Sequence, residues 1–245
     1  NLDSFFFDEN TLKYLLQKNS KDCDVSVIEG VMGFYDGISM SSVKASTHEI
    51  AIITKSPVLL VVDAKGASRS VLAVIHGFLS FFPDNQICGV ILNRCTLGTY
   101  NVLASEIEKR FENKVKPLGF LPTLSDCTVE SRHLGLVTAD EIKDLKNKLD
   151  ILANQAEESI EIDELLRIAN NADVIETEEV IIPKFQEKVR IAVAKDNAFC
   201  FYYKDSINLL KEMGAEIIEF SPMSDATLPE GIPGMYFGGG YPELY

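Results

Sequence analysis

Short, almost wholly apolar runs recur along this chain, and they constrain its fold more than any other feature of the sequence. Each run has the length of a β-strand, and none alternates strictly between apolar and polar residues as a half-exposed strand does. Continuous apolar runs of this length are typical of strands that are covered on both faces. The first four runs span residues 24–29, 57–63, 87–93 and 117–122.

Helical patterns lie between the later runs. Residues 68–81 form one pattern, with Ser68 and Ser70 as candidate N-caps, and residues 99–112 form the next. Strands that alternate with helices predict right-handed βαβ units and a parallel sheet. We therefore predict an α/β fold with a parallel sheet. Two further helices are expected over residues 139–158 and 162–171.

A second α/β unit is predicted toward the C-terminal end of the chain. Residues 177–188 are charged and contain Pro183, which is typical of an extended linker. Three strands and one helix are predicted after it, and these are few for an independent domain. The strands span residues 189–194, 216–220 and 234–238, and the helix spans 203–213 and ends at Gly214. We place a first domain at residues 1–180, a linker at 181–188 and the start of a second domain at 189–245.

The charge balance and the cysteine pattern exclude several classes of function. The formal net charge is −14 and the isoelectric point is about 4.7, so the overall basic surface of a nucleic-acid-binding protein is missing. No apolar run approaches a membrane span, and no secretory leader opens the chain. The five cysteines form no CxxC pair and the three histidines form no close cluster. We therefore expect neither a disulfide framework nor a structural zinc site. We also expect the protein to be located in a reducing cytoplasm.

The glycine-rich segment after the first apolar run is a candidate ligand site. Glu29 ends a buried-type strand, and in open parallel sheets ligands lie beyond the carboxyl ends of strands. This carboxylate could hold Mg²⁺ beside nucleotide phosphates, and Gly30 and Gly33 would let the backbone approach a ligand. Asp36 would then face the substrate or the metal. An alternative interpretation is that Glu29 caps a helix and that Asp36 belongs only to a turn.

Two further strand ends carry polar residues. The loop over residues 63–70 contains Lys65 and Arg69 before a helix start, and such a loop can bind an anion. Asn93 offers a donor and an acceptor, which suits the edge of an adenine. The alternative interpretations are an ordinary loop between strand and helix, and a helix cap.

Three consecutive glycines, at residues 238–240, follow the last predicted strand. Their N–H groups can point toward one place, as an oxyanion hole requires, although a flexible turn would use the same residues. Cys200 has no nearby histidine, so we expect a buried and inert thiol there. His133 is expected to be a hydrogen-bonded loop residue.

Taken in order, these segments resemble one family, the cobyrinic acid a,c-diamide synthases. The start of that family's glutaminase domain is similar to residues 190–199 (RIAVAKDNAF) and 201–203 (FYY). The resemblance extends over essentially the whole chain. Its other motifs are VIEGVMGFYDG at 27–37, LVVDAKG at 60–66, GVILNR at 89–94, RHLGL at 132–136 and GGGYPEL at 238–244.

The resemblance implies a mechanism. A P-loop NTPase-like domain, similar to dethiobiotin synthetase, would bind MgATP and a corrinoid and phosphorylate the a and c acetate side chains of cobyrinic acid. Ammonia would attack each acyl phosphate, which makes the enzyme a carbon–nitrogen ligase of cobalamin biosynthesis. A class I glutamine amidotransferase domain would release that ammonia from glutamine through a cysteine and a histidine. No nucleic acid or membrane partner is implied, and a homodimer is an assembly to test.

The resemblance also implies roles for individual residues, according to the motif in which each residue lies. Glu29 is similar to the Mg²⁺-associated carboxylate, and Asp36 to a catalytic residue that binds substrate or stabilises the phosphorylated intermediate. Gly239 and Gly240 resemble catalytic oxyanion-loop glycines. The ATP-site residues would be Gly30, Asn93 and Arg94, and the substrate site would contain Tyr35, Asp36, Lys65 and Arg69.

The sequence departs from the family pattern near both ends. It contains no GxxxxGK[ST] phosphate loop, and the glutaminase cysteine and histidine are expected beyond Tyr245. We therefore expect these residues alone to show no glutaminase activity and weak or absent ATP binding. Three alternatives stay open: a synthetase that acts on nickel sirohydrochlorin, a P-loop-type ATPase switch similar to chromosome-partitioning proteins, and a non-catalytic scaffold. Residues 188–245 argue against the ATPase switch.

Overall fold

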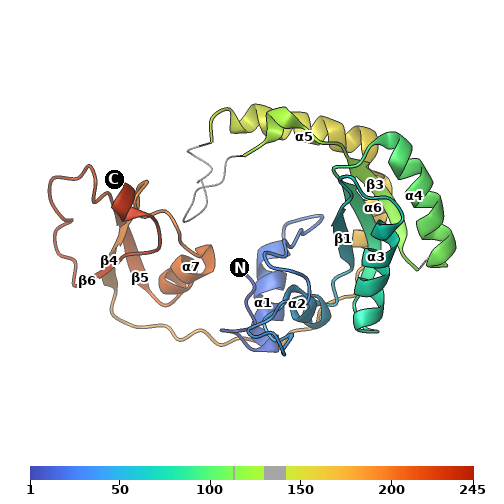
Figure 1. The fold of residues 1–245 in the computed structure, drawn as a ribbon. Coiled ribbons are helices and arrows are strands. Elements are labelled where there is room, and N and C mark those ends of the chain that lie inside the picture. The colour runs from blue at the N-terminus through green and yellow to red at the C-terminus, as the bar shows by residue number, and fades with distance from the viewer. Residues whose placement is uncertain (113, 130–141) are drawn as a thin grey trace. The chain divides into compact units, whose positions relative to one another are not determined.

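The computed structural model describes residues 1–112, 114–129 and 142–245 (Figure 1). The chain divides into two compact units. Residues 2–177 form one unit, and residues 178–245 together with Asn1 form the other. Both units are α/β with parallel sheets, which confirms the predicted fold class.

The sheet of the first unit has three parallel strands in the order β1-β2-β3. The central strand β2 is buried most completely, since Val90 and Leu92 are both 0% exposed. Asp63 and Asn93 are partners in the register, so the carboxyl ends of β1 and β2 are level. The strands are β1 (Val58–Asp63), β2 (Ile87–Asn93) and β3 (Lys116–Leu121), which confirms the last three of the four predicted runs.

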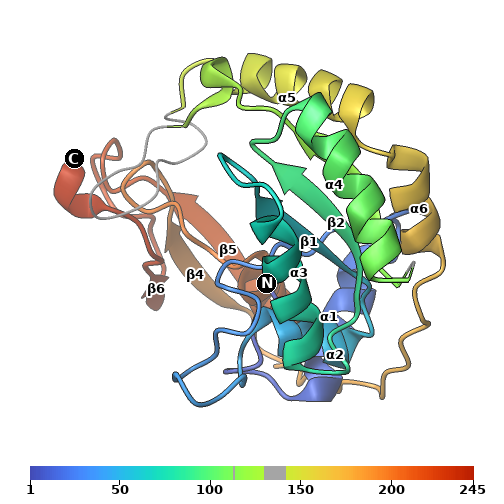
Figure 2. The ribbon, with the colours of Figure 1, turned by 45° about the vertical axis from the view of Figure 1, so that its right-hand side comes forward.

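Two crossover helices connect these strands. The helix α3 (Ser70–Phe81) contacts β1, and α4 (Leu97–Arg110) contacts β3. The two helices also contact each other, and Figure 2 shows them side by side. They bury apolar side chains such as Ile75 and Ile107 against the sheet. The predicted N-caps of α3 are wrong: Arg69 occupies that position without a side-chain cap, because its own backbone is already helical.

Two later helices contact β3. The helix α5 (Leu145–Ser159) begins after Asp144, whose left-handed backbone (φ 61°) cannot continue a helix, and residues 139–141 of the predicted helix lie outside the described residues. The helix α6 (Ile162–Asn170) follows it, and a short 3-10 helix, η1 (Ser125–Cys127), precedes both. Gly119 has φ +134° and pairs with Ile160 just after α5, where a Cβ would overlap the Ser159 carbonyl oxygen.

The first run of the sequence does not form the predicted strand. Residues 24–29 pair with no described strand, and the Val27 side chain is 89% exposed. A strand requires a hydrogen-bonded neighbour, which local apolar character cannot supply. Two helices that the sequence analysis did not predict flank this segment. They are α1 (Glu9–Ser20), capped by the Asp8 carboxylate, and α2 (Thr47–Thr54), capped by the Ser46 hydroxyl.

The second unit has a parallel sheet in the order β5-β4-β6. Its core is small and is formed by Ala192, Ala194 and Phe220. The helix α7 (Lys204–Glu212) connects β4 to β5 and ends just before Gly214 (φ +110°), as predicted. The strands are β4 (Val189–Ala194), β5 (Ala215–Phe220) and β6 (Gly234–Tyr236), and a 3-10 helix, η3 (Pro242–Leu244), follows them.

Among the residues that the structure describes, no helix combines the length and the apolar character that a membrane crossing requires.

Candidate functional site

The carboxyl ends of β1 and β2 bring together four of the polar residues from the sequence analysis. The Arg94 guanidinium binds both oxygens of the Asp63 carboxylate, and its Nε lies 2.8 Å from Oδ1. The Lys65 N–H donates to the same carboxylate at 3.1 Å. Asn93 accepts a hydrogen bond from the Arg94 N–H through Oδ1, at 3.0 Å. A polar strand-end cluster of Asp63, Lys65, Asn93 and Arg94 therefore forms where ligands of parallel sheets bind.

The Asp63–Arg94 pair determines which charges in this cluster can reach a ligand. The hydrogen bond from Arg94 lowers the pKa of Asp63, and the Lys65 N–H adds to the effect. The same interaction raises the pKa of Arg94. The Arg94 guanidinium is therefore already engaged, whereas the Lys65 ammonium has no ion-pair partner among the described residues. Arg69 also has a partner, since its Nη2 lies 3.6 Å from Glu106 Oε2 on α4.

The glycine-rich segment after Glu29 folds upon itself. The Asp36 N–H donates to the Gly33 carbonyl oxygen at 2.9 Å, which closes a tight turn. A Cβ on Gly33 would overlap the Asp36 carboxylate, and a Cβ on Gly30 would overlap the Thr47 side chain at the start of α2. Both glycines therefore allow close packing within this segment, and a larger residue at either position would displace the Asp36 or the Thr47 side chain.

Tyr35 is part of an aromatic cluster at the far end of α3. Its hydroxyl donates to the Phe78 carbonyl oxygen at 2.6 Å, and its ring packs on Phe78, Phe81 and Phe82. Burial raises the pKa of the Tyr35 hydroxyl, and the negative charge of Asp84 adds to this. The phenol is therefore engaged in the fold.

The structure does not bring the two parts of the predicted site together. Asp63 lies just before the first turn of α3, whereas Tyr35 packs on its last turn. Among the described residues, no hydrogen bond or ion pair joins the 33–36 turn to the strand-end cluster. The expectation that Glu29 and Asp36 follow a strand end is wrong in this structure, because residues 24–29 form no strand.

His48, which no sequence motif singles out, packs beside the 33–36 turn. Its side chain is buried, and neither ring nitrogen has a hydrogen-bond partner among the described residues. The ring stacks on Phe82 with centroids 5.1 Å apart, and Nε2 lies 3.8 Å from Asp84 Oδ1. Only the three-dimensional packing shows this residue, because a single histidine on a short helix carries no distinctive sequence signal.

No group of three or more histidine, cysteine, aspartate or glutamate side chains converges anywhere in residues 1–112, 114–129 and 142–245. Glu29 is exposed and would contribute one carboxylate to a site. The RHLGL motif at 132–136, with His133, lies outside the described residues.

In the second unit, the three glycines form a defined loop after β6. The Gly238 N–H donates to the Tyr202 hydroxyl at 2.8 Å, and Gly239 exchanges two backbone hydrogen bonds with Phe201. Two of the three amide groups are therefore engaged by the protein. The Gly240 N–H has no acceptor among the described residues, and Gly240 adopts φ +158°. This loop thus offers one amide donor, not three, to a developing oxyanion.

Cys200 is exposed, which corrects the expectation of a buried thiol. The chain bends over residues 196–199 just before it. Ala198 is buried and Phe199 packs on the core of the second unit, whereas Cys200 lies at the surface.

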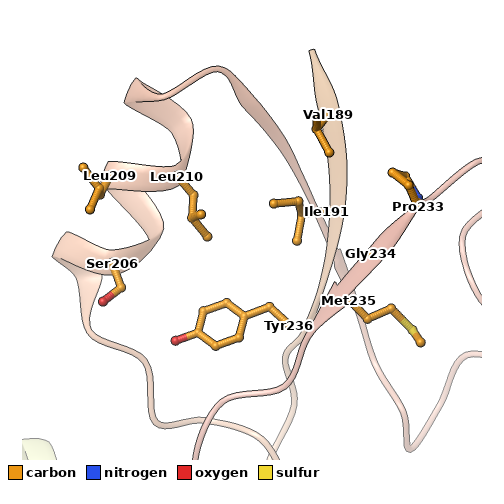
Figure 3. A pocket seen from close by; sticks show the side chains of 9 residues that line it. All are labelled: Val189, Ile191, Ser206, Leu209, Leu210, Pro233, Gly234, Met235 and Tyr236. Carbon is orange, nitrogen blue, oxygen red and sulfur yellow. The ribbon is translucent and has the colours of Figure 1, made fainter. Parts of the chain in front are cut away.

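A separate apolar pocket of about 550 Å³ lies between α7 and the strands β4 and β6 (Figure 3). The hydroxyl groups of Ser206 and Tyr236 are its only side-chain polar groups. Its other lining residues are Val189, Ile191, Leu209, Leu210, Pro233, Gly234 and Met235.

Part of the second unit matches a known protein family. Residues 190–245 match the CobB/CobQ-like glutamine amidotransferase domain. The second unit, with its parallel sheet and glycine loop, is therefore similar to a glutamine amidotransferase domain over residues 190–245, as the resemblance implied.

Curated relatives extend the similarity to the whole chain. It is 43% identical to the cobyrinate a,c-diamide synthase of Caldanaerobacter subterraneus subsp. tengcongensis. It is 41% identical to that of Methanocaldococcus jannaschii and 37% identical to that of Priestia megaterium. All three matches cover 100% of this chain and 53–55% of the relative. The chain is homologous over its whole length to cobyrinate a,c-diamide synthases, and it spans about half the length of these relatives. No solved structure matches it.

Proposed function

We propose that this chain is part of a carbon–nitrogen ligase that amidates the a and c acetate groups of cobyrinic acid in cobalamin biosynthesis. The amido group would come from glutamine, and ATP would activate each carboxylate as an acyl phosphate. The observation that carries the proposal is the whole-length homology to cobyrinate a,c-diamide synthases from bacteria and an archaeon. The amidotransferase match at residues 190–245 supports glutamine as the nitrogen source.

The first unit would contribute part of the nucleotide site. Asn93 keeps its side-chain N–H groups for an adenine edge, and the Lys65 ammonium could approach phosphate oxygens. ATP, when bound, would supply the phosphoryl group that activates the carboxylate. The residues present fit this group only in part, since the sequence has no GxxxxGK[ST] loop and Arg94 is engaged by Asp63. We propose that Glu29 associates with Mg²⁺ and that Gly30 and Arg94 lie near the nucleotide in the longer protein.

The corrinoid would be bound by the polar residues of the first unit. Cobyrinic acid is a polycarboxylate, so cations at the strand ends suit it, and Lys65 and Arg69 are the proposed contacts. Asp36 would face the reacting carboxylate, and Tyr35 would hold the turn that carries it through its contacts with α3.

The second unit would contribute to ammonia release. Hydrolysis of glutamine adds water to the side-chain amide and yields glutamate and ammonia, through tetrahedral intermediates that carry an oxyanion. The Gly240 N–H is the proposed donor to this oxygen, while Gly239 shapes the loop through its bridge with Phe201.

The test measures ADP release by the complete protein, with MgATP and glutamine, in the presence and absence of cobyrinic acid. We expect ADP release that depends on the corrinoid, together with products heavier by one and then two amide substitutions. ADP release that responds to nickel sirohydrochlorin instead would transfer the proposal to that substrate. ATP hydrolysis that neither tetrapyrrole affects would contradict the proposed function.

A further inference from the structure

A single carboxylate, Asp196, ties together two loops of the second unit. Its Oδ1 accepts hydrogen bonds from the Ala198 and Phe199 N–H groups, at 2.9 and 3.0 Å. Its Oδ2 accepts from the Ser221 hydroxyl at 2.9 Å and from the Met223 N–H at 3.0 Å. Asp196 therefore joins the loop after β4 to the segment that follows β5.

The loop that Asp196 holds is in turn the support of the glycine loop. Phe201 and Gly239 exchange backbone hydrogen bonds of 2.9 and 3.0 Å. The Tyr202 hydroxyl accepts from the Gly238 N–H and donates to the Ala194 carbonyl oxygen at the end of β4. A Cβ on Gly240 would overlap the carbonyl oxygen of Ala198, so the two backbones touch directly. A shift of residues 198–202 must therefore move the glycine loop as well.

We propose that Asp196 is a positioning residue for glutamine hydrolysis, which sets the Gly240 N–H by holding residues 198–202. This inference rests on the proposed function, because it assigns a role within the glutaminase half-reaction. Asp196 acts through backbone contacts of residues 198–202 on the glycine loop. The hydrogen bonds of the Asp196 carboxylate join two loops of the same unit. Loss of this carboxylate would therefore loosen the glycine loop while leaving the sheet in place.

The test uses the complete protein and compares Asp196→Ala, Asp196→Asn and the wild type. Asp196→Ala should lower kcat for glutamine hydrolysis about 10- to 100-fold, since misplacing a catalytic group by about 1 Å costs this much. The KM for glutamine should change less than kcat. ADP release supported by free ammonia should stay within about twofold of wild type, since that reaction bypasses the glycine loop. Asp196→Asn should recover part of kcat, because its amide oxygen can still accept from Ala198 and Phe199.

Asp225→Ala is the matched control. Asp225 lies in the same loop after β5 and accepts a hydrogen bond from the Ser221 N–H, but it makes no bond to residues 198–202. We expect its glutaminase kcat to stay within about twofold of wild type. If Asp196→Ala fails to fold by circular dichroism, Tyr202→Phe replaces it. That variant removes the acceptor of the Gly238 N–H, and it should lower kcat in the same selective way.

The outcomes separate this inference from the proposed function. A wild-type protein without glutamine-dependent activity would contradict both. An active wild type whose Asp196→Ala and Tyr202→Phe variants keep full glutaminase kcat would overturn the positioning role alone. An equal loss of the ammonia-supported reaction would also overturn it, because it would indicate general destabilisation.

Discussion

Arg94 is proposed to lie near the nucleotide, but its guanidinium already forms an ion pair within the fold. Its guanidinium holds the Asp63 carboxylate, and Asp63 has a lowered pKa as a result. We predict that Arg94→Gln raises the pKa of Asp63 toward the ordinary value of about 3.9. Side-chain NMR titration measures this. Arg110→Gln is the control, since Arg110 has no ion-pair partner in the described parts of the chain, and it should leave the titration of Asp63 unchanged. An unchanged pKa in Arg94→Gln would contradict the pairing.

The same pair makes a pH-dependent contribution to folding. A carboxylate with a lowered folded-state pKa stabilises the protein fully above its unfolded-state pKa of about 3.9, and the contribution disappears as pH falls through the folded value. Both side chains are about half exposed, so solvent screens the pair and the effect on the unfolding free energy is small.

At the scale of elements, Glu164 fastens α6 to β3. Its carboxylate binds Arg167 on its own helix and Lys116 on β3, and these hydrogen bonds, Arg167 first, lower its pKa to about 2. We predict that Lys116→Met raises the pKa of Glu164. The free energy of unfolding should then fall less between about pH 4 and pH 2 than it does in the wild type. Urea unfolding at pH 7 and pH 3 measures this, and Lys114→Met is the exposed control. An identical pH dependence in both variants would contradict the link between α6 and β3.

The contact between β3 and the end of α5 depends on a glycine. Gly119 adopts φ +134°, and a Cβ there would overlap backbone atoms of Ser159 and Ile160. Gly119→Ala should therefore lower the free energy of unfolding by about 3 kcal/mol, from backbone strain and overpacking. Gly77→Ala is the matched control. It lies on the exposed side of α3 with open space around it, and it should stabilise the protein by about 1 kcal/mol. Equal effects of the two variants in urea unfolding would refute this interpretation.

At the scale of the whole chain, the two compact units differ in how much core supports them. The core of the first unit extends over the three strands and the helices α3 and α4, whereas that of the second unit is formed by Ala192, Ala194 and Phe220. Less apolar burial implies a smaller free energy of local opening. We predict that amides of β4, β5 and β6 exchange with deuterium faster than amides of β1, β2 and β3. Hydrogen exchange with mass spectrometry measures this, and equal protection of both sheets would show that the units unfold together.

Local pattern in the sequence was sufficient for the positions of six strands and for the polar residues at two strand ends, while the register that makes Asp63 and Asn93 level came from the structure. A run of apolar residues identifies a buried strand, and parallel strands of similar length end at one edge of the sheet. The similarity of residues 190–245 to a glutamine amidotransferase domain was also predictable, because residues 190–203 and 238–244 carry distinctive motifs.

Tertiary structure alone decided which of the predicted groups are available. Residues 24–29 have the composition of a strand but no partner to pair with, so Glu29 does not lie at a strand end. Asp63 binds the Arg94 guanidinium. Tyr202 binds the Gly238 amide and Phe201 binds the Gly239 amide, and each of these partners is distant in sequence. Sequence by itself determined the six strands and the helices α3, α4 and α7, because their strand and helix patterns are local, but not the fate of residues 24–29. Hydrogen-bond partners are chosen across the fold, so only the three-dimensional arrangement determined that Gly240 has the open amide and that Asp196 holds its loop in place.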